Sequence, residues 1–345
     1  MNSKNYHIYD DLKVVMQPSA ILWWKELKNA RIFITGGTGF FGCWLLYSIL
    51  YLNKKYGTNI HTVVLTRNPD AFILKAPELA NNKEIILWQG DVRSFEFPKG
   101  QFTHVIHLAT DTTKKPDRLL LDEIVTGTQR VLRFAVAAEA KKLLLTSSGA
   151  VYGEQPQEID FIAEEYQGAC EPSDINSTYG QGKRFVEHIC ALYYKDFGLE
   201  TKVARCFAFV GPYMNMTGHF AIGDFIKDAL ENEAIHINGD GSPLRSYLYA
   251  ADMTNWLWTI LINGIPNRPY NVGSDEAIDI LSLANKVRDI IAPNKDVIIE
   301  NIRADKMNRN KYIPSVERAR KELNIDVWTS LDSAIKKTVE WYIKK

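Results

Sequence analysis

The chain has 345 residues, of which 46% are hydrophobic and 24% charged, as in an ordinary folded globular protein. Its 41 basic and 41 acidic side chains cancel to a formal net charge of zero. This composition excludes a disordered or fibrous chain, and the charge balance gives no reason to expect a nucleic acid or an anionic membrane as partner.

The N-terminus and the cysteines favour a cytoplasmic protein. The first residues, MNSKNYHIYDDLK, are polar where a signal peptide is basic and then apolar. The most apolar stretch, residues 44–52, is far shorter than the ~20 residues that a membrane span needs. The cysteines are widely spaced and form no Cys-x-x-Cys pair, so we expect buried free thiols and no metal site: Cys43, Cys170, Cys190 and Cys206.

Residues 1–30 are expected to form a leader with one amphipathic helical piece over 21–27. After the leader, short apolar strands alternate with helices. The expected strands are 31–35, 62–65, 84–88, 104–108, 142–146 and 201–207, and the expected helices are 44–52, 122–139 and 179–196. Short, fully apolar strands between helices are covered on both faces, which predicts an α/β fold with a Rossmann-type, doubly wound parallel sheet.

The alternation weakens past Gly211, where loops with Gly and Pro become frequent. We therefore predict a smaller C-terminal α/β substrate domain. Residues 31–211 are expected to form the Rossmann domain, to which 241–290 return, and residues 212–345 mainly the smaller domain.

A glycine-rich segment, Thr35-Gly36-Gly37-Thr38-Gly39-Phe40-Phe41-Gly42, lies between the first expected strand and the first expected helix. Glycines let the backbone turn tightly and approach a pyrophosphate, which then meets free N–H groups at the positive end of the helix. A glycine cluster alone can be a tight turn without a ligand. The strand before it and the helix after it favour a dinucleotide.

The end of the second strand bears on which dinucleotide binds. An acidic residue there accepts a hydrogen bond from the ribose 2′-hydroxyl of NAD, whereas an Arg accommodates the 2′-phosphate of NADP. No acid is present in Leu65-Thr66-Arg67. Arg67 therefore favours NADP(H) over NAD(H), the alternative being a solvated loop charge. After the third strand, Asp91, followed by Val92, can accept a hydrogen bond from an adenine amino group.

A set of three residues later in the chain can support redox chemistry on an alcohol. Ser148 follows the fifth strand, and Tyr179 and Lys183 lie four residues apart on one helical face. Moving a hydride to or from a carbinol carbon requires a proton to move on or off its oxygen. A Tyr is too weak a base unless a nearby cation favours its phenolate, and Lys183 can supply that cation. Ser148 can hold the substrate oxygen.

Together with His107-Leu108-Ala109 and Ser147-Ser148-Gly149-Ala150-Val151-Tyr152-Gly153, these motifs resemble those of the extended short-chain dehydrogenase/reductases. The nearest likeness is to the nucleotide-sugar epimerases, dehydratases and 4-ketoreductases, over residues 31 to about 340. The resemblance implies a domain that binds NAD(P), a second that binds a nucleoside diphosphate sugar, and a homodimer. Ser148, Tyr179 and Lys183 would be the catalytic residues. The implied cofactor-binding residues are Gly36, Gly39, Phe40, Phe41, Gly42, Arg67, Asp91, Val92, Leu108, Ala109, Tyr179 and Lys183.

The resemblance also implies a substrate-binding set. The segment around Arg245 is similar to a family segment whose Arg contacts the substrate diphosphate, and a guanidinium suits phosphate oxygens. Arg309 is the candidate for a second phosphate-binding Arg. His219 lies where the family often lines the sugar pocket, although it is also compatible with a surface histidine. Ser148 completes the set.

Departures from the family pattern reduce the number of reactions that the chain is expected to catalyse. The 4,6-dehydratases carry two acidic residues after the catalytic Ser or Thr, and the decarboxylases a Glu, where this chain has Gly149 and Ala150. Neither can carry a proton, although Glu154 or Glu164 could substitute. Ile124 and Ala208 replace Asn residues that many relatives carry.

The leading hypothesis is therefore hydride transfer at C4 of a nucleoside diphosphate hexose, by a 4-ketoreductase or a 4-epimerase. Arg67 slightly favours the 4-ketoreductase, because NADPH is the usual donor for biosynthetic reduction. One alternative is a 4,6-dehydratase with relocated acid and base groups. Another is a catalytically silent regulator that binds NADP, against which the intact catalytic set argues.

Overall fold

The computed structural model describes residues 7–16, 24–110, 117–217, 220–301 and 309–344. Its main element is a seven-stranded parallel sheet in the order β11-β6-β5-β4-β1-β2-β3. The strands are β1 (Arg31–Thr35), β2 (His61–Thr66), β3 (Ile85–Gln89), β4 (His104–His107), β5 (Lys142–Ser148), β6 (Glu200–Cys206) and β11 (Pro269–Val272). The predicted α/β fold with a doubly wound parallel sheet is confirmed, and the six expected strands fall within two residues of β1 to β6.

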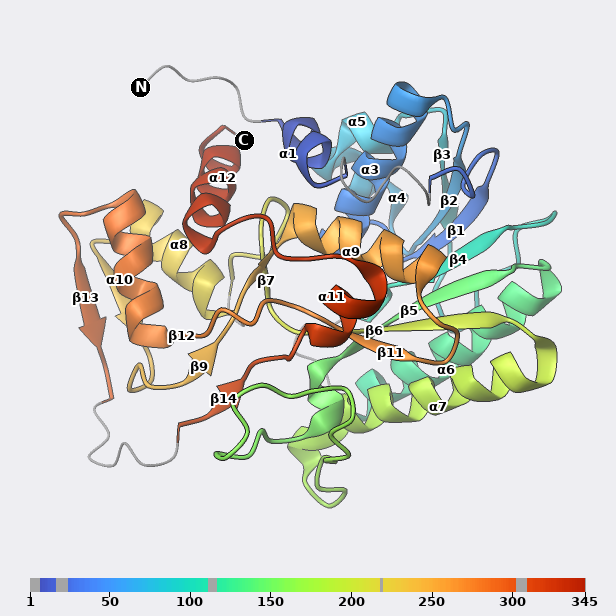
Figure 1. Cartoon of the computed structure of the whole chain (residues 1–345). Helices are drawn as coiled ribbons and strands as arrows, with labels where there is room; N and C mark the ends of the chain where they lie inside the picture. The colour runs from blue at the N-terminus through green and yellow to red at the C-terminus, as the bar shows by residue number, and fades with distance from the viewer. Residues whose placement is uncertain (1–6, 17–23, 111–116, 218–219, 302–308, 345) are drawn as a thin grey trace.

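Helices cover both faces of the sheet (Figure 1). On one face lie α3 (Phe40–Tyr56) and α9 (Ala250–Asn263), which share a core cluster. On the other lie α6 (Asp117–Ala137) and α7 (Thr178–Phe197), which pack beside each other. α3 is apolar almost all round because it is buried along most of its length, and Gly57 ends it in the left-handed conformation at a φ of 61°.

The strand order reverses between β2 and β4, which flank β1 on its two sides. In open parallel sheets, ligands bind in the crevice outside the carboxyl ends of the strands at such a switch point. The glycine-rich segment leaves β1 at this end, and Ser148 is the last residue of β5. The topology therefore brings both sequence motifs to one edge of the sheet.

The C-terminal part contributes smaller sheets and helices beside this edge (Figure 1). A three-stranded sheet joins β12 (Ile278–Asp279), β9 (Leu244–Arg245) and β14 (Lys311–Tyr312), and two-stranded sheets join β13 (Asp296–Ile299) to β8 (Ala234–Ile237) and β10 (Leu248–Tyr249) to β7 (Phe209–Val210). The helices α8 (Ala221–Glu231), α10 (Ile280–Ile291) and α12 (Leu331–Ile343) accompany these sheets, whereas α11 (Glu317–Leu323) packs against β11 and α9. The pairing of β9 with β14 places Arg245 and Tyr312 in register, so residues 67 positions apart become neighbours.

The leader differs from its prediction. The helical piece expected over 21–27 lies partly outside the described residues, and its described part forms a turn, with Trp24 stacked on Tyr56 at 4.7 Å. A helix that the sequence pattern did not reveal, α1 (Ile8–Val15), packs against α3 and α9. Its buried Asp11 accepts a 2.6 Å hydrogen bond from Tyr249 and pairs with Lys337 of α12. The two ends of the chain are thereby joined.

Among the described residues, no helix combines the length and apolar character required to traverse a lipid bilayer.

Candidate active site

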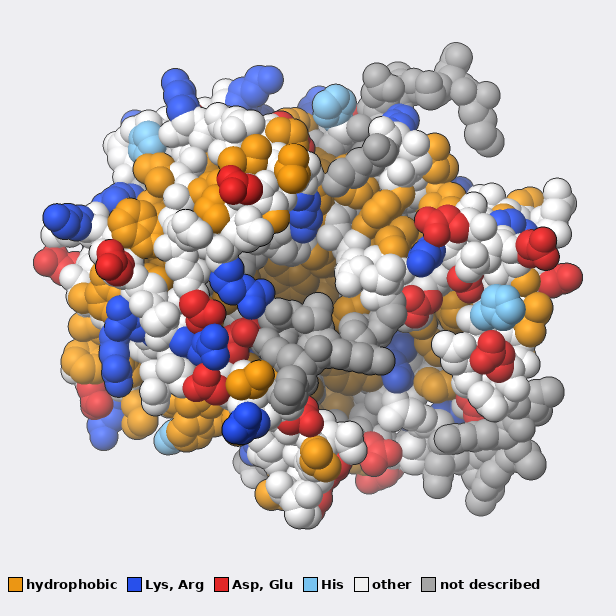
Figure 2. All heavy atoms as spheres, turned by 180° about the vertical axis from the view of Figure 1, so that it is seen from behind, with side chains coloured by type: hydrophobic (Ala, Val, Ile, Leu, Met, Phe, Trp, Pro, Cys, Tyr) orange, Lys and Arg blue, Asp and Glu red, His pale blue; other side chains and the backbone are white. Residues whose placement is uncertain are grey.

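A cavity of about 1130 Å³ opens at the carboxyl ends of the strands. Seen from behind, the molecule is hollowed at its centre, with hydrophobic side chains deep in the hollow and basic side chains at its rim (Figure 2). One end of the cavity is lined by the glycine-rich loop and the tips of β2 and β3, and the other by Arg245, Tyr247 and Tyr312. Ser148, Tyr179 and Lys183 line the same cavity. The cavity therefore has room for a ligand at each end, and the three residues line the same continuous space.

The glycine-rich loop has the geometry that a pyrophosphate requires. Gly36 adopts a φ of 70°, and a β-carbon there would come within 2.8 Å of the backbone of Leu108 and Ala109. Gly39 forms the N-cap of α3 and contributes no side-chain cap, so the first N–H groups of the helix face outward without a side-chain partner. The residues present therefore fit a dinucleotide, with its pyrophosphate on this helix N-terminus.

A buried histidine fixes the loop against the next strand. His107 Nδ1 lies 2.7 Å from Thr35 Oγ1, and its Nε2 lies 3.0 Å from Thr128 Oγ1 on α6. Burial, together with the nearby Lys183 charge, lowers the pKa of His107 to about 3, so the ring is neutral. The sequence reveals His107 only as part of the His107-Leu108-Ala109 motif, whereas the structure shows that it links β1, β4 and α6.

Most residues predicted to bind the cofactor line the cavity: Gly36, Gly39, Phe40, Phe41, Arg67, Asp91, Val92, Leu108 and Ala109. Asp91 is also held by Arg93, whose Nε donates to it at 2.9 Å, and this pairing lowers the pKa of the carboxyl. Gly42 is different. It does not line the cavity, and a β-carbon there would lie 2.3 Å from Gly37, so its role is close packing of α3 against the loop.

One cation at the glycine-rich loop was not predicted. Lys75, at the end of α4 (Pro69–Lys75), lines the cavity and donates a 2.8 Å hydrogen bond to the Thr38 carbonyl. The signal in the sequence was weak, since a Lys in a short helix 33 residues after Gly42 belongs to no motif.

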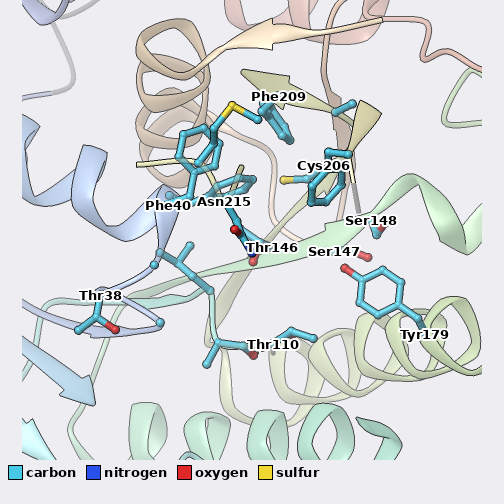
Figure 3. Close-up of a pocket in the computed structure, with 18 of the residues that line it drawn as sticks. Thr38, Phe40, Thr110, Thr146, Ser147, Ser148, Tyr179, Cys206, Phe209 and Asn215 are labelled. Atoms are coloured by element: carbon cyan, nitrogen blue, oxygen red, sulfur yellow. Dashed lines mark hydrogen bonds between the residues drawn. The ribbon is translucent and has the colours of Figure 1, made fainter. Parts of the chain in front are cut away.

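The phenol of Tyr179 points from α7 toward the hydroxyl of Ser148 at the end of β5 (Figure 3). Burial raises the pKa of Tyr179 to about 12, and a hydrogen bond with Ser148 offsets part of that rise. The backbone N–H of Ala150 donates to Ser148 Oγ at 3.1 Å, which fixes the serine rotamer. The phenol is thus protonated at neutral pH and lies beside a hydroxyl that can share a substrate oxygen with it.

The ammonium of Lys183 is held from two sides. It is buried and donates to Thr110 Oγ1 at 2.9 Å and to the Thr146 carbonyl at 2.8 Å. It lies 5.7 Å from the centre of the Tyr179 ring. Burial lowers the pKa of Lys183 to about 8. In the described part of the chain, the hydrogen-bond partners of the ammonium are therefore these two threonines.

A partly buried polar network supports the C-terminal end of β5. Ser147 donates to Glu187 on α7 at 2.5 Å, and Arg205 on β6 binds the same carboxylate with two nitrogens, the shorter contact being 2.7 Å. Arg205 also donates to the Tyr152 hydroxyl at 2.9 Å. This ion pair joins β5, β6 and α7, and no sequence pattern indicated it because its members belong to separate elements.

Position 149 has no room for a side chain. A β-carbon at Gly149 would meet the Tyr312 hydroxyl and two ring carbons of Phe207, each at 2.7 Å. The substitutes considered for the missing acid lie elsewhere: Glu154 is exposed, and Glu164 accepts a hydrogen bond from the Asn271 N–H at 2.8 Å. Neither lines the cavity, whose acidic lining residues in the described part of the chain are Asp91 and Glu123.

Only some of the predicted substrate-binding residues line the cavity. Arg245 lines the cavity, and burial lowers the pKa of its guanidinium. Arg309 is exposed and does not line it; its carbonyl accepts a hydrogen bond from Gln157, and the nearby residue that reaches the cavity is Tyr312. His219 lies outside the described residues. Ala208 lines the cavity without the amide of the family Asn, and Ile124 is buried in the core.

Taken together, a parallel sheet with a reversed strand order, a glycine-rich loop at its switch point and a Ser-Tyr-Lys set beside it define a dinucleotide-dependent enzyme of the extended short-chain dehydrogenase/reductase class. The family model for the "NAD dependent epimerase/dehydratase family" matches residues 32–273. The chain belongs to this family, whose members modify nucleotide sugars.

Known proteins of several activities resemble the chain. UDP-glucuronic acid decarboxylase 1 of Xenopus tropicalis is 27% identical over 332 residues, which cover 93% of this chain and 74% of the relative. UDP-glucuronic acid decarboxylase 6 of Arabidopsis thaliana is 29% identical over 313 residues, covering 86% and 84%. Among solved structures, UDP-glucose 4-epimerase of Thermotoga maritima with UDP-glucose aligns at a TM-score of 0.76 and 20% identity, covering 91% of this chain and 99% of that one. UDP-glucuronic acid 4-epimerase of Bacillus cereus, in complex with UDP-glucuronic acid and NAD, aligns at 0.76 and 21% identity with the same coverage. The structures share the fold, and the relatives span several reactions.

Proposed function

We propose that this enzyme transfers a hydride at C4 of a UDP-sugar, as a 4-ketoreductase or a 4-epimerase. The observation that carries the proposal is the composition of the site. It combines a Tyr179–Ser148 pair that can move a proton with a filled position 149 at which no acid can act on a neighbouring carbon. Proton transfer at one oxygen is then the chemistry that the side chains near Ser148 support.

Each of these side chains has a separate role in the proposed reaction. Ser148 holds the oxygen on the reacting carbon, and Tyr179 gives that oxygen its proton or takes it back. Lys183 holds a ribose hydroxyl of the cofactor and stabilises negative charge that develops on the phenol. Arg245 binds the diphosphate at the far end of the cavity. When bound, the dinucleotide supplies or accepts the hydride.

Two features support net reduction with NADPH. The raised pKa of Tyr179 keeps its phenol protonated at neutral pH, which is the form that donates a proton to a carbonyl oxygen. Arg67 lines the cavity at the tip of β2, where the described residues place no acid to accept a ribose 2′-hydroxyl. We accordingly propose NADP(H) as the preferred cofactor, although solved relatives contain NAD.

A decarboxylase is the second candidate, because the curated relatives with 27–29% identity carry that activity. The two candidates differ in what leaves the sugar. C4 redox chemistry changes only the oxidation state or configuration at one carbon, whereas decarboxylation of UDP-glucuronic acid releases carbon dioxide.

The deciding experiment incubates the protein with NAD(P) and, separately, UDP-glucose and UDP-glucuronic acid, and analyses the products by mass spectrometry and NMR. The proposal predicts an isomer of unchanged mass, or oxidation of the sugar matched by cofactor reduction. Release of carbon dioxide would establish the decarboxylase, and loss of water a dehydratase. No change in either sugar with any cofactor would overturn the assignment to these UDP-sugars.

We also propose a homodimer formed through α6 and α7. These two helices carry exposed apolar side chains on their outer surfaces: Leu119 and Leu121 on α6, and Phe185, Leu192 and Phe197 on α7. Of the residues considered from the sequence, Phe185 is 50% exposed, whereas Ile189 is buried and Tyr193 packs on the core. Sedimentation of the wild type and of Phe185→Asp tests the proposal, which requires the variant to dissociate.

A further inference from the structure

Thr110 is a polar residue of the cavity to which neither the sequence motifs nor the proposed reaction gives a role. It follows the His107-Leu108-Ala109 motif and lines the cavity (Figure 3). Its hydroxyl oxygen accepts a 2.9 Å hydrogen bond from the Lys183 ammonium, and the hydroxyl donates its own hydrogen to the Ala109 carbonyl at 2.8 Å. Because that hydrogen is used, the oxygen presents a lone pair to the ammonium.

The segment that carries Thr110 is held against the cofactor loop. The Leu108 N–H donates to the Thr35 carbonyl at 3.1 Å, and the Ala109 N–H donates to the Thr35 hydroxyl at 3.3 Å. Gly36 lies so close to this segment that a β-carbon there would fall 2.8 Å from the Ala109 nitrogen. The Thr110 hydroxyl therefore has a defined position relative to the end of β1 and the glycine-rich loop.

The second acceptor of the Lys183 ammonium belongs to another strand. It is the Thr146 carbonyl of β5, which accepts at 2.8 Å. An ammonium has three N–H donors, so these two described partners leave one for a ligand in the cavity that Lys183 lines. Two acceptors on separate elements fix the direction of the third N–H, whereas one acceptor would leave the flexible lysine side chain free to turn.

Burial opposes the charge that this ammonium carries. The Lys183 residue is 4% exposed, and burial lowers its pKa to about 8. An oxygen that accepts a hydrogen bond from the charged form of a group favours that form. The Thr110 hydroxyl therefore offsets part of the effect of burial in addition to orienting the nitrogen.

Titratable groups on four elements also act on the ammonium. They are Tyr179, Glu187 and Cys190 on α7, Glu123 on α6, Cys206 on β6 and His107 on β4. Burial raises the pKa of Tyr179 and of Cys206 to about 12. A substitution at position 110 leaves all of these groups in place, so a change in the titration of Lys183 reports the loss of the threonine hydroxyl.

We propose that Thr110 is a positioning residue of the hydride-transfer site, whose hydroxyl keeps the Lys183 ammonium charged and aims its remaining N–H at the ribose of the cofactor. This inference rests on the proposed function in the role that it gives to Lys183, and it does not depend on which sugar binds. Thr110 is then the link between the cofactor loop and the catalytic residues.

Calorimetric titration of the full-length protein with NADPH and with NADH, repeated over a range of pH, tests the proposal. Thr110→Val keeps the shape of the side chain and removes the oxygen. Because a hydrogen bond to a charged group is lost, the pH at which cofactor affinity falls should move down by about one to two units. Thr110→Ala, which is smaller and also lacks the oxygen, should give the same shift. Thr110→Ser retains the hydroxyl and should restore the wild-type midpoint.

Thr259→Val is the matched control. Thr259 is buried in α9, does not line the cavity, and donates to the main-chain carbonyl of Asn255 at 2.8 Å, the same type of hydrogen bond that the Thr110 hydroxyl makes to Ala109. Its substitution should leave the pH midpoint unchanged.

A double-mutant cycle with Lys183→Met separates positioning from direct contact. If Thr110 acts through the ammonium, Thr110→Val changes cofactor affinity little in the Lys183→Met background. Equal losses in both backgrounds would overturn the proposal, because Thr110 would then contact the cofactor itself. An unchanged midpoint in Thr110→Val, or a lowered one that Thr110→Ser does not restore, would also overturn it. These results leave hydride transfer at C4 intact, whereas a wild type that shows the shift and modifies no sugar would refute the proposed function alone.

Discussion

The substitution Gly149→Ala measures directly whether the space beside Ser148 is filled. The added β-carbon would lie 2.7 Å from the Tyr312 oxygen and from two Phe207 ring carbons, whereas ordinary contact begins at about 3.4 Å. The neighbours would have to retreat by about 0.7 Å, the difference between these distances. Phe207 is buried and packs against the Tyr312 ring with the centroids 4.6 Å apart, so it has little freedom to move.

Overpacking of this kind costs about 1–3 kcal/mol. Replacing Gly by Ala at a compatible backbone conformation returns about 0.4–1 kcal/mol by restricting the unfolded chain. We therefore expect a net loss of roughly 0–2.6 kcal/mol in the free energy of unfolding, about 1.3 kcal/mol at the middle of the range. We also expect weaker binding of the sugar nucleotide, because the Tyr312 hydroxyl is displaced.

Denaturant unfolding and calorimetric binding provide the assay. Gly239→Ala is the matched control, since a β-carbon there meets nothing within 4 Å, and it should leave both quantities nearly unchanged. A Gly149→Ala protein as stable as the wild type, with unaltered sugar binding, would refute the argument that Phe207 and Tyr312 fill this position.

Three further predictions concern the charged residues of the cavity. Arg67→Ala should weaken NADPH much more than NADH in fluorescence titrations, because only NADPH presents a 2′-phosphate; equal losses would show that Arg67 does not contact it. Arg245→Ala should raise KM for the sugar nucleotide about 10- to 100-fold with little change in cofactor affinity, since a charge-assisted hydrogen bond contributes roughly 1.5–3 kcal/mol. A change in cofactor affinity alone would show that Arg245 binds the cofactor and not the sugar nucleotide. Lys183 has its pKa lowered to about 8, so its positive charge is complete well below pH 8 and disappears as the pH rises through that value. Cofactor affinity measured by calorimetry should therefore fall above about pH 8 in the wild type and be flatter in Lys183→Met, whereas identical profiles would contradict a role for this charge.

The parts of the molecule that follow from local sequence were predictable. The apolar strands and the glycine-rich loop obey short-range rules, and Tyr179 and Lys183 are joined by the spacing of one helix turn. The carboxyl ends of parallel strands meet at one edge, which is why the sequence alone could place Ser148 and Gly36 in a common site.

Long-range contacts were not predictable in the same way. Tyr312 lies 164 residues from Ser148, and a two-residue strand has no periodicity to reveal it. Arg309, three residues earlier, matches the family pattern only loosely and is exposed. The leader helix α1 was missed because its stability comes from packing on α3 and α9, to which its short sequence gives no clue.

The central claim is that hydride leaves or enters at C4 while Tyr179 moves the proton. The most direct measurement supplies UDP-glucose or UDP-glucuronic acid deuterated at C4 together with oxidised dinucleotide, and follows the label by mass spectrometry. The account predicts deuterium on the cofactor with the wild type: on the recovered cofactor if the sugar is oxidised net, and on the cofactor of the acid-quenched reaction if the hydride returns to C4 during epimerisation. The rate should be at least 100-fold lower with Tyr179→Phe at unchanged sugar binding, since general acid–base catalysis contributes about 10²–10⁴-fold. A label that remains on the sugar while an analogue deuterated at C3 transfers its own, or full transfer by Tyr179→Phe, would contradict it.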